Sequence, residues 1–308
     1  MRTQLPLAVL AAALACLLTT GPAHARARTF VASYGNDANP CTFGSPCKTF
    51  QVAVNAVDAG GEVTAIDSAG FGPILITKAV TITSPNGVEA GIVPVSGGNS
   101  ITINAGPFDA ITLSGLVIDG AETGANGVVF AVGGYLIMQD CVIRNMTSDG
   151  IHFVPNFISH LSVTNTLVSN NGRNGILVQP VGSASVTAVF ERVRAQFNGQ
   201  TAWGIAIDAS QTSGSVNGSA TDSSSFYNGG GFLVIGNNTG DNFGNLVRSL
   251  VAQNNTGVEG DNIGRVYISQ TTIINNRLPC SGNVFTYSDN TVNNNGKDCI
   301  PAGTALKD

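Results

Sequence analysis

The sequence predicts an all-β protein. The expected fold is a right-handed parallel β-helix, a three-sheet solenoid with a short N-terminal capping helix. Three observations predict it: an internal repeat of about 25 residues, a glycine that opens the third strand of each copy, and an asparagine-rich position at one turn. Helices cannot be this short and this often interrupted by Gly and Asn. We therefore expect three short strands per coil, stacked into three parallel sheets.

The composition fits a rigid, turn-rich β chain with an acidic balance. Of 308 residues, 38 are Gly, only 11% are charged, and the formal net charge is −5. Val, Ile and Leu recur at regular places, which excludes a disordered chain. A nucleic-acid partner would need a basic face, so no nucleic acid is expected as a partner.

Residues 1–25 read as a signal peptide. Arg2 precedes the apolar run Leu5–Leu18, and Ala23-His24-Ala25 offers a cleavage site. Cleavage near Ala25 predicts a secreted or periplasmic protein. Lipid modification at Cys16 is the alternative. No later segment is long and apolar enough to span a bilayer, so no membrane span is expected.

Residues 26–62 are expected to form an N-terminal cap. Thr29–Ala32 reads as a strand, a Pro/Gly loop follows, and Lys48–Val57 reads as a short helix that Gly60-Gly61 stops. A solenoid must cover its raw sheet edges, and this helix would lie over the first coil. Its apolar face would consist of Phe50, Val54 and Val57.

Cysteines near both ends of the chain predict two local disulfides. Cys41 and Cys47 lie in the Pro/Gly loop of the cap, and Cys280 and Cys299 flank the last coil. Export brings thiols into an oxidising space, where such pairs close. Cys141 lies in an apolar run and is expected to be a buried thiol, with a reactive thiol as the alternative.

Residues 63–300 carry the repeat, and 301–308 form a polar tail. The clearest copies begin at Leu113, Met138 and Val163. Weaker copies begin at Val189, Val247, Ile268 and Tyr287. The third strand of successive copies opens with Gly127, Gly150, Gly175, Gly204 and Gly231.

The eighth position of each copy predicts how the coils stack. Equivalent residues of neighbouring coils lie ~4.8 Å apart, and side-chain amides both donate and accept hydrogen bonds. Asn also tolerates the left-handed backbone of sharp turns. A ladder of stacked amides is therefore expected through Gly120, Asn145, Asn170, Gln196, Asn254, Asn275 and Asn294.

These features resemble a known superfamily. Within residues 28–82, the segments 36–41, 46–50, 59–62 and 76–82 are similar to the start of exported bacterial β-helix proteins without an assigned role. The chain as a whole resembles the pectin-lyase-like right-handed β-helix superfamily. Many members cut or bind polysaccharide, so the resemblance implies a carbohydrate link. It rests on the fold, and fold alone does not give function.

No catalytic residue can be carried over from the enzymes of this superfamily. The polygalacturonase motifs Asn-Thr-Asp, Asp-Asp, Gly-His-Gly and Arg-Ile-Lys do not occur in this sequence. The Arg-x-Pro-x-x-Arg stretch of pectate lyases does not occur either. Candidate chemistry must therefore come from the expected stacking of the coils.

The third position of the repeat provides one candidate pair. Asp140 and Glu191 would share a column two coils apart, or ~10 Å, close to the ~6.5–9.5 Å between the carboxylates of inverting glycosidases. A lyase would instead need a base, for which Arg144 and His152 are the candidates. A solvated bend that accepts any polar residue explains the same column.

The seventh position places Asp119 beside Arg144, as a surface ion pair. With Arg173, Arg192 and Arg194 nearby, Asp119 is a candidate substrate-binding residue, because arginines bind the carboxylates of acidic sugars in bidentate fashion. Scattered, solvated charges are the alternative interpretation.

His152 is expected to point outward from its strand, in an unusually apolar column. The column reads Val129, His152, Leu177, Ala206 and Leu233. Free surfaces rarely carry large apolar patches. Either the loop Val154–Ser159 covers this face, or the protein self-associates through it, or sugars stack on it.

No metal site and no cofactor are predicted. A calcium ion among Asp241, Glu259 and Asp261 was weighed against an ordinary loop role for these residues. The leading functional hypothesis is an exported β-helix that binds or acts on an extracellular or cell-wall polysaccharide, as a lyase or glycoside hydrolase if it is an enzyme. The rival is a non-catalytic surface or scaffold protein that presents loops from a rigid solenoid.

Overall fold

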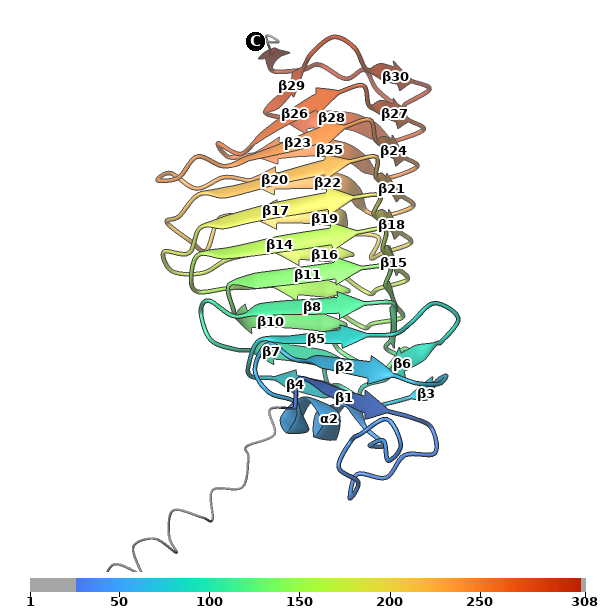
Figure 1. Cartoon of the computed structure of the whole chain (residues 1–308). Helices are drawn as coiled ribbons and strands as arrows, with labels where there is room; N and C mark the ends of the chain where they lie inside the picture. Colours follow the sequence, from blue (N-terminus) through green and yellow to red (C-terminus); the bar gives the residue numbers. More distant parts are fainter. Residues whose placement is uncertain (1–25, 306–308) are drawn as a thin grey trace, which may run out of the picture.

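A computed structural model describes residues 26–305 of the chain. They form one rod of stacked coils (Figure 1). Each coil runs from a 12-stranded sheet through a 10-stranded sheet to a 9-stranded sheet, and all the paired strands of the three sheets are parallel. The expected three-sheet parallel β-helix is confirmed. The predicted signal peptide, residues 1–25, lies outside the described residues.

The 12-stranded sheet contains β1 (Arg28–Val31), β2 (Glu62–Ala65), β5 (Val80–Thr83), β8 (Ala110–Ser114), β11 (Tyr135–Gln139), β14 (Ser159–Thr164), β17 (Val186–Glu191), β20 (Val216–Thr221), β23 (Phe243–Val247), β26 (Arg265–Ser269), β29 (Val284–Thr286) and β31 (Gly303–Thr304). The 10-stranded sheet contains β3 (Ala69–Gly70), β6 (Ala90–Ile92), β9 (Leu116–Asp119), β12 (Val142–Arg144), β15 (Leu167–Ser169), β18 (Arg194–Gln196), β21 (Ser224–Phe226), β24 (Leu250–Ala252), β27 (Thr272–Ile274) and β30 (Thr291–Asn293). The 9-stranded sheet contains β4 (Ile74–Ile76), β7 (Ile101–Asn104), β10 (Val128–Val132), β13 (Ile151–Phe153), β16 (Ile176–Val178), β19 (Trp203–Asp208), β22 (Gly230–Ile235), β25 (Thr256–Asp261) and β28 (Leu278–Gly282).

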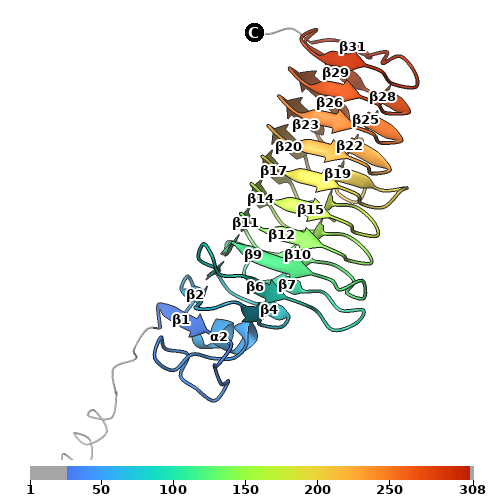
Figure 2. The same ribbon diagram turned by 90° about the vertical axis from the view of Figure 1, so that its right-hand side faces the viewer.

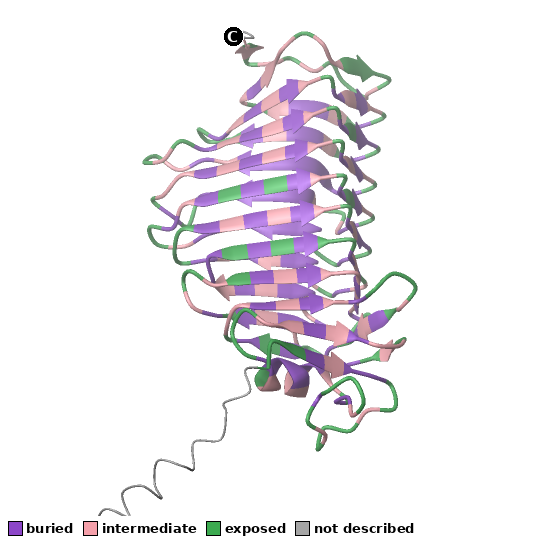
Figure 3. Cartoon of the chain, in the orientation of Figure 1, coloured by how far each residue is buried: buried purple, intermediate pink, exposed green. Residues whose placement is uncertain are grey.

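Alternation along the strands sends one set of side chains into the rod and the other set outward (Figure 3). In β14, for example, Ser159, Leu161 and Val163 are buried and the residues between them are partly exposed. The interior is a single apolar core that extends from the cap to the last coils. Since burial of apolar surface is the main stabilising term, the stacked aliphatic columns hold the coils together.

The repeat alignment is confirmed for the first copies and wrong by one residue at the fourth. Met138 pairs in register with Leu113 and with Val163. Val163 then pairs with Phe190 instead of Val189. A shift of one residue exchanges the two faces of a strand, and here both faces carry apolar residues, so the pattern does not fix the register.

The amide ladder exists, but its register also differs from the prediction. Asn145 and Asn170 occupy successive coils with a left-handed backbone. The hydrogen-bonded amides belong to the next residue along the chain: Asn171 Nδ2 donates to Asn198 Oδ1 (2.9 Å), and Asn198 Nδ2 donates to Asn228 Oδ1 (3.0 Å). The buried ladder comprises Asn171, Asn198, Asn228, Asn254, Asn276 and Asn295.

The glycine column at the start of the third strand has a steric cause. A Cβ at Gly175 would lie 2.5 Å from the carbonyl oxygen of Gly204, and a Cβ at Gly150 would lie 2.6 Å from that of Gly175. Real Cβ atoms do not approach so closely. Only glycine lets consecutive coils stack at this turn.

The cap is confirmed, with a shorter helix than expected. Helix α2 (Phe50–Ala56) lies over the end of the first coil (Figure 1). The predicted apolar face is buried, since Phe50, Val54 and Val57 are at most 2% exposed. The helix ends before Gly60-Gly61 because Val57 already has an extended backbone.

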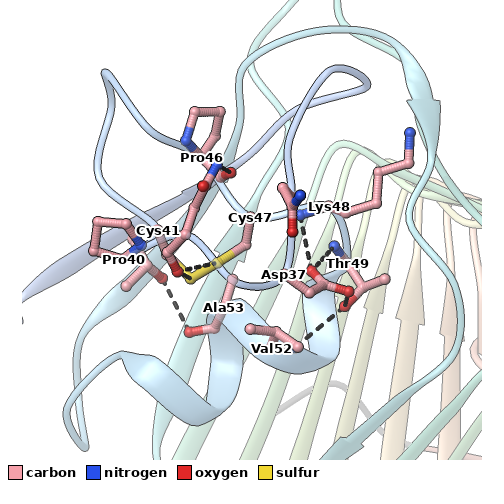
Figure 4. Close-up of a disulfide and its surroundings, with 12 residues drawn as sticks. Asp37, Pro40, Cys41, Pro46, Cys47, Lys48, Thr49, Val52 and Ala53 are labelled. Atoms are coloured by element: carbon pink, nitrogen blue, oxygen red, sulfur yellow. Dashed lines mark hydrogen bonds between the residues drawn. A yellow bond between two sulfur atoms is a disulfide. The ribbon is translucent and has the colours of Figure 1, made fainter.

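A disulfide and one carboxylate fix the cap loop (Figure 4). Cys41 and Cys47 are bonded, as predicted. Asp37 accepts hydrogen bonds from the backbone amides of Lys48 and Thr49 (both 2.9 Å), and the Thr49 hydroxyl caps the helix through the Val52 amide. The second predicted disulfide, Cys280–Cys299, is present near the C-terminal end, and Cys141 is a buried thiol.

Candidate functional site

A hollow opens on the outer face of the 10-stranded sheet near the cap, across β3, β6, β9 and β12. Its volume is about 720 Å³. Gly70 and Gly91 pair in register with each other and then with Val117. The next coil places Val142 in the same outward column. The hollow forms because two coils present glycine where later coils present a side chain, and we call it the glycine hollow.

Two loops raise the walls of the glycine hollow. The loop between β5 and β6 projects beside it (Figure 1) and brings Glu89 to the rim. The turn after β9 contributes Ala121 and Glu122, both with a left-handed backbone (φ 49° and 60°). Acidic groups therefore stand on both sides of the glycine floor.

Asp119 and Arg144 lie side by side in the glycine hollow. Arg144 Nε donates to Asp119 Oδ2 at 2.8 Å, which confirms the predicted pair. Asp119 Oδ1 also accepts from Asn145 Nδ2 (3.0 Å) and from the Ala121 amide (2.9 Å). Burial raises the pKa of Asp119, but these hydrogen bonds and the Arg144 charge together hold it below its usual value. The carboxylate is thus a fixed anion, already shared among three donors.

The charge of the glycine hollow does not match an acidic sugar. Glu89, Asp119 and Glu122 line it together with Arg144 as the only cation among its described lining residues. An acidic polymer would meet a surplus of carboxylates. The expectation that arginines select an acidic sugar therefore finds no support here.

The proposed carboxylate pair is wrong in its geometry. Glu191 pairs in register with Thr164, at the end of the 12-stranded sheet. The residue in the column of Asp140 and Asn165 is Arg192, because the backbone hydrogen bonds run from Asp140 to Thr164 and from Asn165 to Glu191. Asp140 and Glu191 are thus offset by one position, and Asp140 accepts from Asn165 instead.

The predicted arginines are spread over different parts of the rod. Arg192 pairs with Glu191 at the corner between the 12- and 10-stranded sheets. Arg194 lies on the outer face of the 10-stranded sheet and donates to Gln196 (3.4 Å). Arg173 lies after the amide ladder, just before β16. They do not gather around Asp119 and Arg144.

His152 lies on a different face, that of the 9-stranded sheet. It points outward next to Asp149, with 4.0 Å between Nδ1 and Oδ2. Burial lowers its pKa against the opposing charge of Asp149, and the charge of Arg173 adds to the lowering. Asp149 is itself buried and accepts two hydrogen bonds from Asn174. The structure therefore does not bring His152 together with Arg144.

The apolar column beside His152 is buried within the single chain. Leu177, Ala206 and Leu233 are at most 7% exposed and cluster with Trp203 and Ile235. The loop that was expected to cover them leaves Phe157 50% exposed. The premise of an exposed column is wrong for these three residues, and self-association through this face stays a prediction.

The three carboxylates considered for calcium have other roles. Asp241 forms an ion pair with Arg265. Glu259 and Asp261 follow each other on β25, where burial and the charge of Asp261 raise the pKa of Glu259. Within residues 26–305, no group of three His, Cys, Asp or Glu side chains is arranged to hold a metal ion.

Comparison with solved structures decides the fold family. The chain matches XylC in complex with xylose (TM-score 0.66, 8% identity, 84% of this chain and 68% of that chain) and a rhamnogalacturonan lyase (TM-score 0.54, 15% identity, 84% and 75%). It also matches the pectate lyase Pel9A (TM-score 0.51, 14% identity, 84% and 67%). The chain has the pectin-lyase-like right-handed β-helix fold. No family model and no curated protein sequence matches it.

Sequence reasoning on this β-helix missed most of the glycine hollow. It identified Asp119 and Arg144 but not Gly70, Gly91 or Glu122. A signal was present, since the two glycines occupy a column in which other coils carry Val, Leu or Arg. Using it required the register of β3 and β6, which the repeat did not reveal.

Proposed function

We propose that this protein is an exported β-helix that binds an extracellular polysaccharide in the glycine hollow. Structural neighbours support the ligand class, because their names describe lyases of pectate and rhamnogalacturonan and a complex with xylose. Two disulfides support the location, since disulfides persist in oxidising compartments. Among the described residues, no helix has the length and apolar character to cross a membrane.

The observation that carries the proposal is the glycine hollow itself. Its volume lies within the ~300–1,000 Å³ of typical ligand sites. Its floor is backbone and small side chains, so a ring can approach closely. Asp119, held by three donors, presents a pre-oriented acceptor, and pre-orientation lowers the entropy cost of binding a hydroxyl group.

Binding is supported better than catalysis. The catalytic candidates Asp140, Glu191 and His152 are distributed over one corner and the face of another sheet. Arg144 is engaged with Asp119 and is therefore a poor base. A lyase or hydrolase activity would have to use Glu89 or Glu122, the remaining carboxylates of the glycine hollow.

A glycan panel tests the proposal. The purified exported chain is titrated with neutral and acidic polysaccharides, and products are followed as reducing ends or unsaturated sugars. We expect binding without products. Silence on every sugar would contradict the proposal and favour the scaffold rival, while product formation would identify an enzyme.

A filling variant locates the site. A Cβ at Gly70 meets nothing within 4 Å, so Gly70→Val fills the hollow without a clash. We expect an affinity loss of at least about tenfold, since the ring loses its floor. Ser224→Val is the matched control, because Ser224 lies in the same outward column on β21, outside the hollow. Equal affinity in both variants would move the site elsewhere.

A further inference from the structure

The glycine hollow continues along the rod. A second hollow of about 430 Å³ shares Glu122 and Asn145 with it. A third hollow of about 780 Å³ shares Phe197 and Gln200 with the second. Together the three follow the corner between the 10- and 9-stranded sheets, on the side that Figure 2 turns toward the viewer. We call this continuous depression the corner groove.

Two aromatic side chains form a platform in the middle of the corner groove. The rings of Phe197 and Tyr227 lie parallel, with centroids 4.8 Å apart and 7° between their planes. They come from successive coils, and each is nearly half exposed (49% and 45%). Phe226 supports both rings edge-on from the end of β21. The platform is therefore held rigidly before any ligand arrives.

The backbone under the platform argues for a role beyond stability. Phe197 and Tyr227 both have a left-handed conformation (φ 55° and 56°). That conformation is rare for bulky residues and is tolerated best by Asn. Other coils obey this preference, because their equivalent residues are Asn145, Asn170, Gln253, Asn275 and Asn294. Two coils thus carry strained, exposed aromatics where amides would fit without strain, and such strain gathers at functional sites.

Amide groups surround the platform. The third hollow is lined by Gln200, Gln253 and Asn255, which are exposed, and by the ladder residues Asn228 and Asn254. The ladder amides are engaged with one another, so the exposed amides face a ligand. An amide both donates and accepts, as a sugar hydroxyl does. An aromatic face suits the C–H face of a sugar ring.

The charge of the corner groove selects among polysaccharides. Its described lining contains three carboxylates (Glu89, Asp119 and Glu122) and two guanidinium groups (Arg144 and Arg277). Near the platform, only Arg277 is charged. A polyanion would gain nothing over most of this length and would be repelled at the glycine hollow.

We propose that the corner groove binds one extended, uncharged polysaccharide chain parallel to the rod axis, with sugar rings stacked on Phe197 and Tyr227. The proposal rests on the proposed function and specifies its ligand and direction. Coils follow each other every ~4.8 Å, so a chain along the corner contacts a new coil at each step. Affinity should therefore grow with oligosaccharide length.

The test replaces both aromatics by the residue that the column prefers. In Phe197→Asn/Tyr227→Asn, the left-handed backbone is kept and its strain is relieved, so the melting temperature should stay equal or rise. Affinity for a neutral polysaccharide should fall at least tenfold by calorimetry. Tyr135→Thr is the matched control, because Tyr135 is equally exposed on the 12-stranded sheet and its loss should leave binding unchanged.

The outcomes separate this inference from the proposed function. Unchanged affinity in the double variant, with Gly70→Val still weakened, would overturn the platform and leave the glycine hollow as the site. Affinity that is the same for a disaccharide and for longer oligosaccharides would overturn the extended mode. Preference for an acidic polymer would overturn the charge assignment. If no glycan binds the wild-type chain, the proposed function fails and this inference fails with it.

Discussion

Cys141 occupies a position that other coils give to a hydroxyl group. Its Sγ donates to the Gln139 carbonyl (3.2 Å), as Ser223 donates to Thr221 (2.9 Å) and Ser249 donates to Val247 (2.8 Å). In each case the acceptor lies two residues earlier at the corner between the 12- and 10-stranded sheets. The thiol therefore acts as a small buried donor in a column of side-chain to backbone bonds.

Cys141 should be inert in the folded protein. Burial raises the pKa of its thiol to about 11, and the thiolate is the reactive form. A disulfide reagent at pH 8 should label it only after unfolding. Cys141→Ser should change the free energy of unfolding by no more than about 1 kcal/mol, whereas Cys141→Leu should cost ~1–3 kcal/mol by overpacking. Rapid labelling of the native protein would contradict this account.

Asp119 gives stability a defined dependence on pH. Because its pKa is lower in the folded state than in the unfolded state, its contribution is present above the unfolded pKa and is lost as pH falls through the folded pKa. Asp119→Asn should therefore destabilise the protein at neutral pH, and the difference from wild type should shrink in acid. Denaturant unfolding at several pH values measures it. A difference that grows toward low pH would be incompatible with this assignment.

At the scale of elements, the ladder shows what the sequence reveals. Short strands, the glycine column and an amide-rich turn were predictable, because each follows from a residue type at a repeated spacing. The hydrogen-bonded column was assigned one residue early, because Asn170 and Asn171 are both Asn and the sequence does not show which amide is buried. The slip at Val189 has the same origin, since Val189 and Phe190 are both apolar.

The ladder makes a sharp prediction for two neighbouring asparagines. Asn198 accepts hydrogen bonds from the amide and side chain of Asn171 and donates to Asn228. Asn198→Ala leaves these buried groups without partners and should cost ~1–3 kcal/mol. Asn170→Gly keeps the left-handed backbone at an exposed position and should stay within about 0.5 kcal/mol of wild type. Urea unfolding of both variants provides the comparison, and equal costs would refute the assigned register.

At the scale of the whole molecule, function depends on what the corners do. The sequence placed Asp119 and Arg144 on one face because they fall in the clearest copies of the repeat. The platform was not predicted, because Phe197 and Tyr227 lie in the copies whose register slipped. A groove also depends on which columns are empty, and Gly70 and Gly91 became informative only when paired with Val117. Long-range pairing, which no local pattern encodes, carries that information.

The central claim is that a polysaccharide chain lies along the corner groove. The most direct measurement is a crystal structure of the exported chain with the shortest neutral oligosaccharide that reaches full affinity. Sugar rings should stack on Phe197 and Tyr227, with the chain running from coil to coil toward Gly91. Sugar bound on the outer face of the 12-stranded sheet, with the corner groove empty, would contradict the account.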